Sequence, residues 1–434
     1  MSRSIHRVIA GLIVGVLFAA TPAAFAVTPV DIVIKQGDVF GARTVSTLNA
    51  PFTDGLGKVG FVAAFDDSTR GIWHSSGFVF NSSDALPDSL TGGEGTMGVS
   101  NLGNFIYSPS FNGGDAVYTA GGKLLADGDA VPNNPGLFSV FNSRPTMLPN
   151  GTAHWIGGTS TTAGGSTSNR HLFRATDPNN PMSISRIISG GDVIEGKAIS
   201  TAASNFNYDI SDNGSHHVHI LDMVTGSTTN NVHVYRDGAF VAQESLPVGD
   251  GTNWENFDGV FVNNAGDWLL HGDTSGATTS DEFIAFKGEI KVREGQTIDG
   301  ITLASGASVN AASIDNKNNV VHTWGWGSGT TAQEHLFFGD ADDLINGVRL
   351  LSRNDQVDSD GDTIADWIIT DFEASTVIGP GLDLAEDGFV FVEVSMIPAA
   401  GGTEIGAILR VEVPEPATVG LLALGLLAIR RRRR

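Results

Sequence analysis

The sequence has no cysteine among its 434 residues. Disulfide bonds, cysteine-ligated metal sites and a cysteine nucleophile are therefore excluded, so a buried core must hold the fold together. The chain also lacks the Gly-x-Ser-x-Gly turn of a serine nucleophile and the His-Glu-x-x-His helix of zinc proteases. With these catalytic signatures absent, the sequence favours a protein that is not an enzyme.

Positive charge is scarce as well. Arg3, Arg7 and residues 430–434 supply seven of the 25 basic residues, and Glu415 supplies one of the 48 acidic residues, so residues 27–413 carry a net charge of −29. Nucleic acids and anionic membranes are polyanions and would be repelled by such a body. The charge argues against both as partners and favours cation binding instead.

Sustained helical spacing of apolar residues is missing outside the two ends of the chain. Instead, the body contains short alternating apolar segments rich in Val, Ile and Phe, separated by many of the 55 glycines. Such segments are typical of strands. The sequence therefore predicts an all-β body that can bury a large core.

The first 26 residues have the three-part form of a secretory signal. Arg3, His6 and Arg7 give a basic start, and residues 8–20 form a continuous apolar run. A membrane anchor is the alternative, but a helical span of about 30 Å needs about 20 residues, and this run is shorter. The small residues Ala24 and Ala26 fit a signal peptidase, so we expect cleavage after Ala26 and export across the inner membrane.

Residues 414–434 form a second terminal unit. Val413, Pro414, Glu415 and Pro416 precede an apolar segment at 417–429 and five arginines at 430–434. The segment is marginal for a membrane helix, although arginine stems can extend it by snorkelling, and the arginines should remain cytoplasmic. A generic tail anchor would explain the helix and the charges but not the Pro-Glu-Pro.

These three parts, in this order at the extreme C-terminus, resemble the PEP-CTERM sorting signal of Gram-negative bacteria that carry an exosortase. The resemblance covers residues 413–434 only. It implies that exosortase processes the chain near Pro414, Glu415 and Pro416, and that the membrane helix is a transient anchor. It also implies that the body is released from the cell or attached to its surface.

One short element recurs seven times in residues 27–413. It consists of a polar or small residue, two variable positions, a glycine, one variable position and an alternating apolar run. The glycine position is occupied in the seven copies by Gly57, Gly103, Gly151, Gly214, Gly266, Asn318 and Gly388. Glycine allows the left-handed backbone of a tight turn, and Asn tolerates it next best. The element therefore predicts a turn that leads into a strand.

The copies are separated by 46, 48, 63, 52, 52 and 70 residues, and each interval holds about four apolar segments. Four-stranded sheets that repeat at this length are typical of a β-propeller. We therefore predict a propeller-like ring of seven blades over residues 27–413. A row of β-sandwiches and an elongated β-solenoid are the alternatives. The body also resembles the tandem NxxGxVAF repeats of exported bacterial proteins, which implies repeat architecture and no established activity.

One acidic loop is a candidate calcium site. Its carboxylates alternate around a glycine and belong to Asp358, Asp360, Asp362 and Asp366. Carboxylates in such a pattern can converge on Ca²⁺. An EF-type loop would need a bidentate Glu at position 12, which is Ile369 here. A solvated acidic loop is the alternative, and no cofactor other than Ca²⁺ is expected.

Two groups of side chains have competing interpretations. His217 and His219 lie two apart on one expected strand and could share a metal ion, with His216 beside them, or they could belong to a polar strand face. Exposed tryptophans such as Trp254 and Trp324, with Trp326, could stack on sugar rings or pack between blades.

These features lead to a hypothesis of an exported, exosortase-sorted, non-enzymatic repeat protein that contacts a cell-surface partner or an exopolysaccharide matrix. Signal peptidase and exosortase are the expected processing partners. One alternative is a secreted carbohydrate-active enzyme with carboxylates in the propeller channel. Another is a structural or adhesive protein stabilised by Ca²⁺. The expected organisation is a signal peptide at 1–26, a repeat body at 27–413 and a sorting tag at 414–434.

Overall fold

The computed structural model describes residues 27–414 except 54–56, 76, 82–96, 100–103, 109, 112–113, 202–204 and 373–380. The expected signal peptide and C-terminal helix lie outside these residues, as do Ala26, Glu415 and Pro416. Within the described part the helical segments are the 3-10 turns η2 (Pro181–Ser183), η3 (Gly329–Thr331) and η4 (Leu344–Asn346). None of the helices there is long and apolar enough to cross a membrane.

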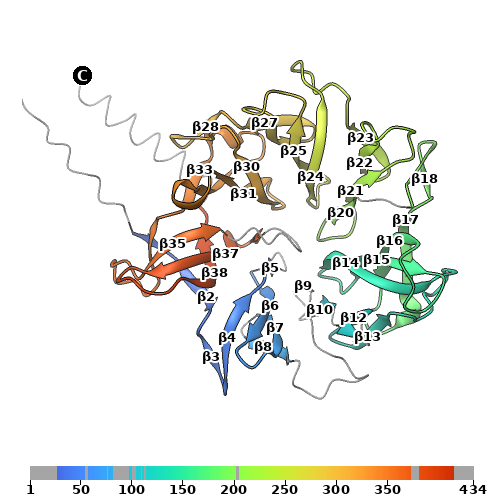
Figure 1. Cartoon of the computed structure of the whole chain (residues 1–434), viewed down its shortest axis with the longest axis horizontal. Coiled ribbons are helices and arrows are strands. Elements are labelled where there is room, and N and C mark those ends of the chain that lie inside the picture. The colour runs from blue at the N-terminus through green and yellow to red at the C-terminus, as the bar shows by residue number, and fades with distance from the viewer. Residues whose placement is uncertain are drawn as a thin grey trace, which may run out of the picture.

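The described body is all-β, as predicted, and its sheets stand around a central opening (Figure 1). Their strands pair antiparallel except for β1 with β34. Six sheets have four strands of five or more residues each. The first three of these sheets are β4 (Arg43–Leu48), β6 (Val59–Phe65), β7 (Arg70–His74) and β8 (Gly77–Asn81); β14 (Leu137–Met147), β15 (Ala153–Ser160), β16 (Asn169–Ala175) and β17 (Ile184–Ser189); and β20 (Phe206–Ile210), β21 (His217–Asp222), β22 (Val232–Arg236) and β23 (Ala239–Gln243).

The other three regular sheets complete the ring. They are β24 (Trp254–Val262), β25 (Trp268–Thr274), β26 (Glu282–Phe286) and β27 (Glu289–Arg293); β30 (Ser308–Ile314), β31 (Asn319–Trp326), β32 (Gln333–Asp340) and β33 (Val348–Ser352); and β35 (Trp367–Phe372), β37 (Phe389–Pro398), β38 (Ile405–Glu412) and β2 (Asp31–Lys35).

Shorter strands extend the ring sheets or form hairpins of their own. They are β3 (Val39–Phe40) and β5 (Phe52–Thr53) in the first sheet; β1 (Thr28–Pro29), β34 (Gln356–Asp358) and β36 (Leu382–Leu384) in the last; and the hairpins β18 (Val193–Ile194) with β19 (Lys197–Ala198) and β28 (Thr297–Ile298) with β29 (Ile301–Thr302).

The prediction of seven equivalent blades is not confirmed, because the sheet between β8 and β14 differs from the other six. It contains β9 (Met97–Val99), β10 (Phe105–Tyr107), β11 (Ser110–Phe111), β12 (Gly114–Thr119) and β13 (Gly122–Ala126). Only β12 and β13 reach five residues. The described part of the chain is thus a propeller-like ring of six regular blades, with this shorter sheet between two of them.

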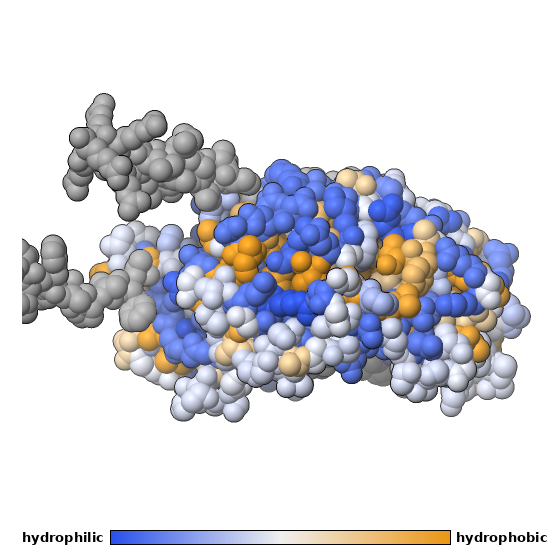
Figure 2. All heavy atoms as spheres, turned by 90° about the horizontal axis from the view of Figure 1, so that it is seen from above, coloured by the Kyte–Doolittle hydropathy of each residue, from blue (hydrophilic) through white to orange (hydrophobic). Residues whose placement is uncertain are grey.

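The two ends of the body meet in one blade. Strand β2 pairs with β38, with Ile32 opposite Leu409, and the Asp31 carboxylate forms an ion pair of 2.9 Å with Arg410. An N-terminal strand therefore completes the C-terminal sheet and covers an edge that would otherwise be open. Seen edge-on, the body is flatter than it is wide, and hydrophilic residues surround smaller hydrophobic areas on its rim (Figure 2). A row of sandwiches and an elongated solenoid are both inconsistent with this ring.

The repeated element has the predicted conformation. Its apolar run forms the second strand of each sheet, namely β6, β10, β15, β21, β25, β31 and β37. The turn residue has a positive φ wherever it is described, from 64° at Asn318 to 87° at Gly57 and Gly388. Gly103 lies outside the described residues. Asn318 thus occupies the left-handed region that its place in the pattern predicts.

Large apolar side chains fill the space between neighbouring sheets. One cluster joins Phe261 and Leu269 of the β24–β27 sheet to Trp324 and Phe337 of the β30–β33 sheet. Full burial of each such side chain contributes on the order of 1.5–3 kcal/mol. Because the clusters lie between blades, the core follows the ring and leaves the central channel to be lined by the inner strands.

Candidate functional site

The inner strands of the ring end together at one mouth of the central channel. The lining residues come from the ends of β5, β9, β14, β20, β24, β30 and β36 and from the turns that follow them. The hollow has about 990 Å³ of space, including open solvent. Each strand end reaches it because the repeated turn directly follows the inner strand. The repeat therefore places seven chain segments around one opening.

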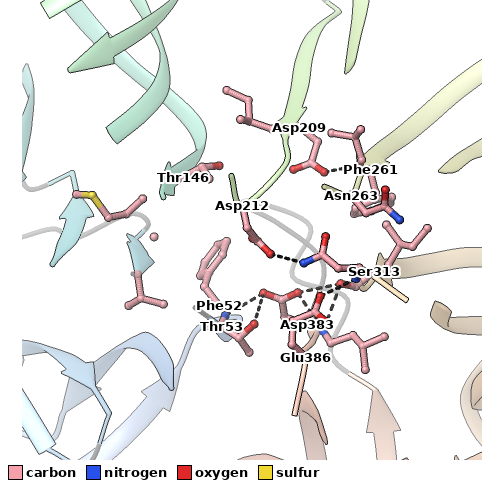
Figure 3. A pocket seen from close by; sticks show the side chains of 18 of the residues that line it. Phe52, Thr53, Thr146, Asp209, Asp212, Phe261, Asn263, Ser313, Asp383 and Glu386 are labelled. Atoms are coloured by element: carbon pink, nitrogen blue, oxygen red, sulfur yellow. Dashed lines mark hydrogen bonds between the residues drawn. The ribbon is translucent and has the colours of Figure 1, made fainter. Parts of the chain in front are cut away.

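The mouth is acidic. Four carboxylates line it, and they belong to Asp209, Asp212, Asp383 and Glu386 (Figure 3). Asp383 accepts hydrogen bonds from the Thr53 N–H at 2.9 Å, the Thr53 hydroxyl at 3.2 Å and the Ser313 hydroxyl at 2.9 Å. It therefore joins the first sheet, the β30–β33 sheet and the last sheet at the channel.

Asn316 holds two of the acids. Its backbone N–H donates to Glu386 Oε1 at 2.6 Å, and its side-chain Nδ2 donates to Asp212 Oδ2 at 3.0 Å. Burial raises the pKa of Glu386, the carboxylates of Asp315 and Asp212 raise it further, and the Asn316 N–H partly opposes them. Asn316 thus holds two carboxylates, one through its backbone N–H and one through its side-chain amide.

The turns around the mouth are linked to one another. The Asn213 N–H donates to Asn264 Oδ1 at 2.8 Å, and the Asn264 N–H donates to Asn316 Oδ1 at 2.7 Å. The Asn316 N–H continues the series to Glu386. We call this series the turn ring. Each N–H finds its acceptor in the next turn, so the repeat stabilises the contact between blades as well as its own turn.

The turn ring continues from the last repeat to the first. A Cβ on Gly57 would lie 2.1 Å from Asp387 Oδ2, so the first turn packs directly against the last. Gly57 also has a φ of 87°. Both facts require glycine at this position.

Sequence reasoning did not identify the residues at the channel mouth. Asp212, Asn264, Asn316 and Glu386 all occupy the second position of the repeated element. An acidic or amide side chain at that position in four successive copies was the available signal. The first position and the glycine at the fourth define the turn, so the pattern treats the second position as variable.

The structure brings together three of the four acids in the candidate calcium loop. Oxygen atoms of Asp358, Asp360 and Asp366 lie within 4.8 Å of one another, and Asp362 is not part of that group. The Asp362 carboxylate instead accepts the Ile364 N–H at 2.7 Å. The loop therefore offers three convergent carboxylates.

Backbone amides of the loop fold around the same acids. Asp358 accepts the N–H groups of Gly361 at 2.7 Å and Thr363 at 2.8 Å, and Asp366 accepts the Ser359 N–H at 2.8 Å. Burial acts to raise the pKa of Asp358, but the N–H groups outweigh it and hold that pKa below its usual value. These contacts fit either a cation loop or a self-contained acidic turn.

The three candidate histidines contact one another or a neighbouring aspartate. The rings of His217 and His219 lie 4.9 Å apart between centroids, and His216 Nδ1 lies 2.8 Å from Asp237 Oδ2. Burial, with His217 adding to it, lowers the pKa of His219 to about 3. The described residues contain two groups of three or more potential metal ligands, and these histidines belong to neither.

The hypothesis that tryptophans stack on sugar rings is wrong for two of the three candidates, because their side chains are buried. Trp254 is 6% exposed and Trp324 is fully buried. Trp326 is partly buried against the same cluster as Trp324. These side chains pack between blades.

The body ends where the sorting tag begins. Val413 is 8% exposed, and its N–H donates to the Gly388 carbonyl at 3.0 Å. Pro414 follows it at partial exposure. The first residue of the expected processing segment is therefore anchored to the last blade.

Residues 412–434 match the PEP-CTERM protein-sorting motif. The motif indicates an exported protein that exosortase processes and sorts to the cell surface or the outside of the cell. The match covers the end of the chain and does not extend to the propeller-like body. The resemblance to NxxGxVAF repeats has no support from homologues, because no curated protein matches the chain.

Several solved structures are similar to this chain at low identity. The N-terminal BBS1 fragment bound to ARL6 has 9% identity and a TM-score of 0.39, and the match covers 90% of this chain and 98% of that chain. A PL25 ulvan lyase has 10% identity and a TM-score of 0.38, and the match covers 89% of this chain and 95% of that chain. The WD40 propeller domain of Doa1 has 10% identity and a TM-score of 0.36, and the match covers 87% of this chain and 99% of that chain. We draw no functional argument from likenesses this distant.

Proposed function

We propose that the protein is a surface or matrix component whose channel mouth binds a polysaccharide of neutral or amino sugars, without turning it over. The observation that carries the proposal is the channel mouth, where four carboxylates lie beside the turn ring. It gathers acceptors, amide groups and hydroxyls from the inner strands at one opening. The sorting motif supports a location where such a polysaccharide would be met.

The chemistry of the mouth suits a polyhydroxylated ligand. Asp212 and Glu386 can accept hydrogen bonds from sugar hydroxyls, while Asn316 Nδ2 has two N–H groups and donates one of them to Asp212, which leaves a donor nearby. Phe52 lines the same opening and offers an apolar face. The acidic surroundings disfavour anionic polysaccharides, because like charges repel. A neutral or amino-sugar polymer therefore fits better than a uronate or a sulfated chain.

Binding can be tested with a panel of neutral, amino-sugar and uronate polysaccharides against the purified protein. The paired variant D212N/E386Q keeps oxygen acceptors for the existing hydrogen bonds but removes both charges. Charge-assisted hydrogen bonds are about twice as strong as neutral ones, so we expect affinity for the best ligand to fall about tenfold.

A matched control is E289Q/D342N, which removes two exposed acids that both contact Lys291 on the rim. This control should bind like the unmodified protein. Equal loss in both variants, or no binding to any polymer, would reject the proposal.

Carbohydrate hydrolysis is the second candidate function, and one observation favours it. Burial raises the pKa of Glu386, and Glu386 and Asp212 both accept hydrogen bonds from Asn316, Glu386 from its backbone N–H and Asp212 from its side chain, as an acid and its partner carboxylate could. A release of reducing ends that E386Q lowers by more than a hundredfold, with binding kept within about tenfold, would support the enzyme over the binding protein.

We further propose that the β9–β13 sheet is a seventh blade. Gly98 and Val99 of β9 line the channel mouth with the other inner strands, and a Cβ on Gly98 would lie 2.5 Å from the Pro145 carbonyl oxygen of β14. These two contacts support the proposal that the sheet serves as a blade. An experimental density map with six blades and a gap between β8 and β14 would reject this.

Processing at the C-terminus completes the proposal. The signal peptide at 1–26 is removed, residues 417–429 anchor the chain transiently, and exosortase acts at the Pro-Glu-Pro. Mass spectrometry of the mature protein from an exosortase-containing cell should give a body that begins at Val27 and lacks residues 417–434. An intact C-terminus on the mature protein would contradict it.

A further inference from the structure

A second group of ligand-type side chains lies on the β24–β27 sheet, outside the residues that line the channel mouth. One ligand atom each of Asp258, His271 and Glu282 lies within 4.8 Å of the others. The three residues come from β24, β25 and β26, which are neighbours in the sheet. An imidazole between two carboxylates is a donor set that divalent transition metals prefer, and it is not explained by polysaccharide binding.

A β-bulge places Asp258 in this group. The register of β24 against β25 shifts between Phe257, opposite Gly272, and Gly259, opposite His271. Asp258 is the extra residue and stands outside the ladder. Bulges re-aim a side chain and are frequent next to functional sites. Without the shift, the side chain of residue 258 would follow the regular alternation of the strand.

The imidazole of His271 is held in a fitted space. A Cβ on Gly259 would lie 2.2 Å from His271 Nε2, so the ring occupies the place that any larger residue at 259 would fill. The ring also stacks on Phe261, with centroids 6.2 Å apart and an angle of 17°. His271 is 7% exposed. The ring is therefore oriented before any ligand arrives.

Glu282 is held from the neighbouring blade. Its Oε1 accepts the Val309 N–H of β30 at 2.8 Å, and the residue is 7% exposed. Hydrogen bonds of this kind orient metal-ligating carboxylates in proteins. Asp258, in contrast, is exposed and leaves the group open to solvent. The arrangement thus has two fixed donors inside and one accessible donor outside.

The group has an excess of negative charge. Oxygen atoms of two carboxylates, Asp258 and Glu282, lie within 4.8 Å of each other in this group. A divalent cation would offset the repulsion among these acids. Since one donor is nitrogen, Zn²⁺ or Mn²⁺ suits the set better than Ca²⁺, which takes oxygen ligands.

We propose that Asp258, His271 and Glu282 bind a divalent transition metal ion, of the Zn²⁺ or Mn²⁺ class, at the junction of the β24–β27 and β30–β33 blades. The ion would tie strands β24, β25 and β26 together and, through the Val309 contact, reach the next blade. An open coordination position on the Asp258 side would remain for water.

The test uses the purified protein, treated with chelator and dialysed, and titrated calorimetrically with ZnCl₂ and with MnCl₂. We expect one equivalent of at least one metal to bind, and D258N and E282Q each to weaken that binding at least tenfold. Asp258 is exposed and E282Q keeps an acceptor for the Val309 N–H, so both variants should fold, which circular dichroism verifies.

The control is E289Q, which removes an exposed acid from the same sheet and should bind the metal as the unmodified protein does. Co²⁺ provides a second readout, because its visible absorption reports nitrogen ligation and should be lost in H271Q. No stoichiometric binding of either metal, or binding that D258N and E282Q leave unchanged, would overturn the proposal.

Discussion

Asn316 and Glu386 are 70 residues apart in the chain and are joined by a hydrogen bond of 2.6 Å from the Asn316 N–H to Glu386 Oε1. The bond connects the turn after β30 with the turn before β37. It is one step of the turn ring, in which second-position residues of the repeat link neighbouring blades. Asn316 and Glu386 also line the channel mouth, where Glu386 is one of four carboxylates. Under the proposed function, the stability of the ring and ligand binding at its opening would depend on the same two residues.

The first prediction concerns this bond. Glu386→Ala removes the acceptor and leaves the Asn316 N–H without it, which should cost about 1–3 kcal/mol of unfolding free energy. Glu386→Gln keeps an oxygen acceptor and should unfold within about 0.5 kcal/mol of the unmodified protein. Denaturant unfolding of both variants measures the difference. Equal stability of E386A and E386Q would show that the bond contributes nothing to the ring.

The second prediction compares two glycines of the repeat. Gly388→Ala introduces a Cβ at a φ of 87° with no neighbour within 4 Å, so strain alone should cost about 1–2 kcal/mol. Gly57→Ala has the same φ and also places its Cβ 2.1 Å from Asp387 Oδ2. It should therefore lower the melting temperature more. A G57A variant as stable as G388A would mean that the contact between the first and last turns is not needed.

The third prediction is a loss of stability in mild acid. Burial is the main cause that lowers the pKa of six histidines, to about 3 for His154, His219 and His322 and to about 4 for His171, His233 and His335. In the unfolded chain each takes up a proton near pH 6.5. Their contribution is complete above about pH 6.5 and is lost as the pH falls toward 4.

Two glutamates act in the opposite direction. Burial raises the pKa of Glu282 to about 9 and of Glu334 to about 7. Their contribution to the free energy of unfolding therefore grows as the pH falls toward 4.5, the ordinary pKa of a glutamate in the unfolded chain. Six histidines outnumber them between about pH 6.5 and 4.5, and the melting temperature should fall across that window.

The acid sensitivity can be assigned with one variant pair. His322→Gln keeps an acceptor for the Trp324 Nε1 donor, which lies 3.0 Å from His322 Nδ1, and should flatten the pH dependence. Glu289→Gln, at an exposed position away from these histidines, should not. A melting temperature that is constant from pH 7 to 4.5 would contradict the assignment.

The fourth prediction separates the residues of the acidic loop. If the loop binds Ca²⁺, millimolar CaCl₂ should raise the melting temperature by several degrees, because binding to the native state alone adds about 2.7 kcal/mol at a hundredfold excess over Kd. Asp360→Asn should abolish the rise, while Asp362→Asn should retain most of it, since only Asp360 lies in the three-oxygen group. No effect of calcium or chelator would remove the calcium-stabilised alternative.

Local features of this fold could be predicted from the sequence. The positive φ of Asn318 follows from its place in a glycine pattern, and the strands after each turn follow from alternating apolar residues. The order Pro-Glu-Pro, apolar segment and arginines predicted the motif match at 412–434. These signals act within a few neighbouring residues, so spacing alone reveals them.

Contacts between distant parts of the chain could not be predicted in this way. The pairing of Asn316 with Glu386 depends on how two blades meet, and the group of Asp258, His271 and Glu282 depends on a bulge that shifts one register. The lengths of the strands in the β9–β13 sheet could not be predicted from spacing either. Its turn matches the repeat pattern, but pattern matching does not fix the lengths of β9 and β10.

Equilibrium binding of the preferred neutral or amino-sugar polysaccharide to the unmodified protein, to D212N/E386Q and to E289Q/D342N tests the central claim most directly. The account predicts an affinity about ten times weaker for D212N/E386Q and an unchanged affinity for E289Q/D342N. Identical affinities for all three proteins would contradict it, because the ligand would then bind elsewhere than at the channel mouth.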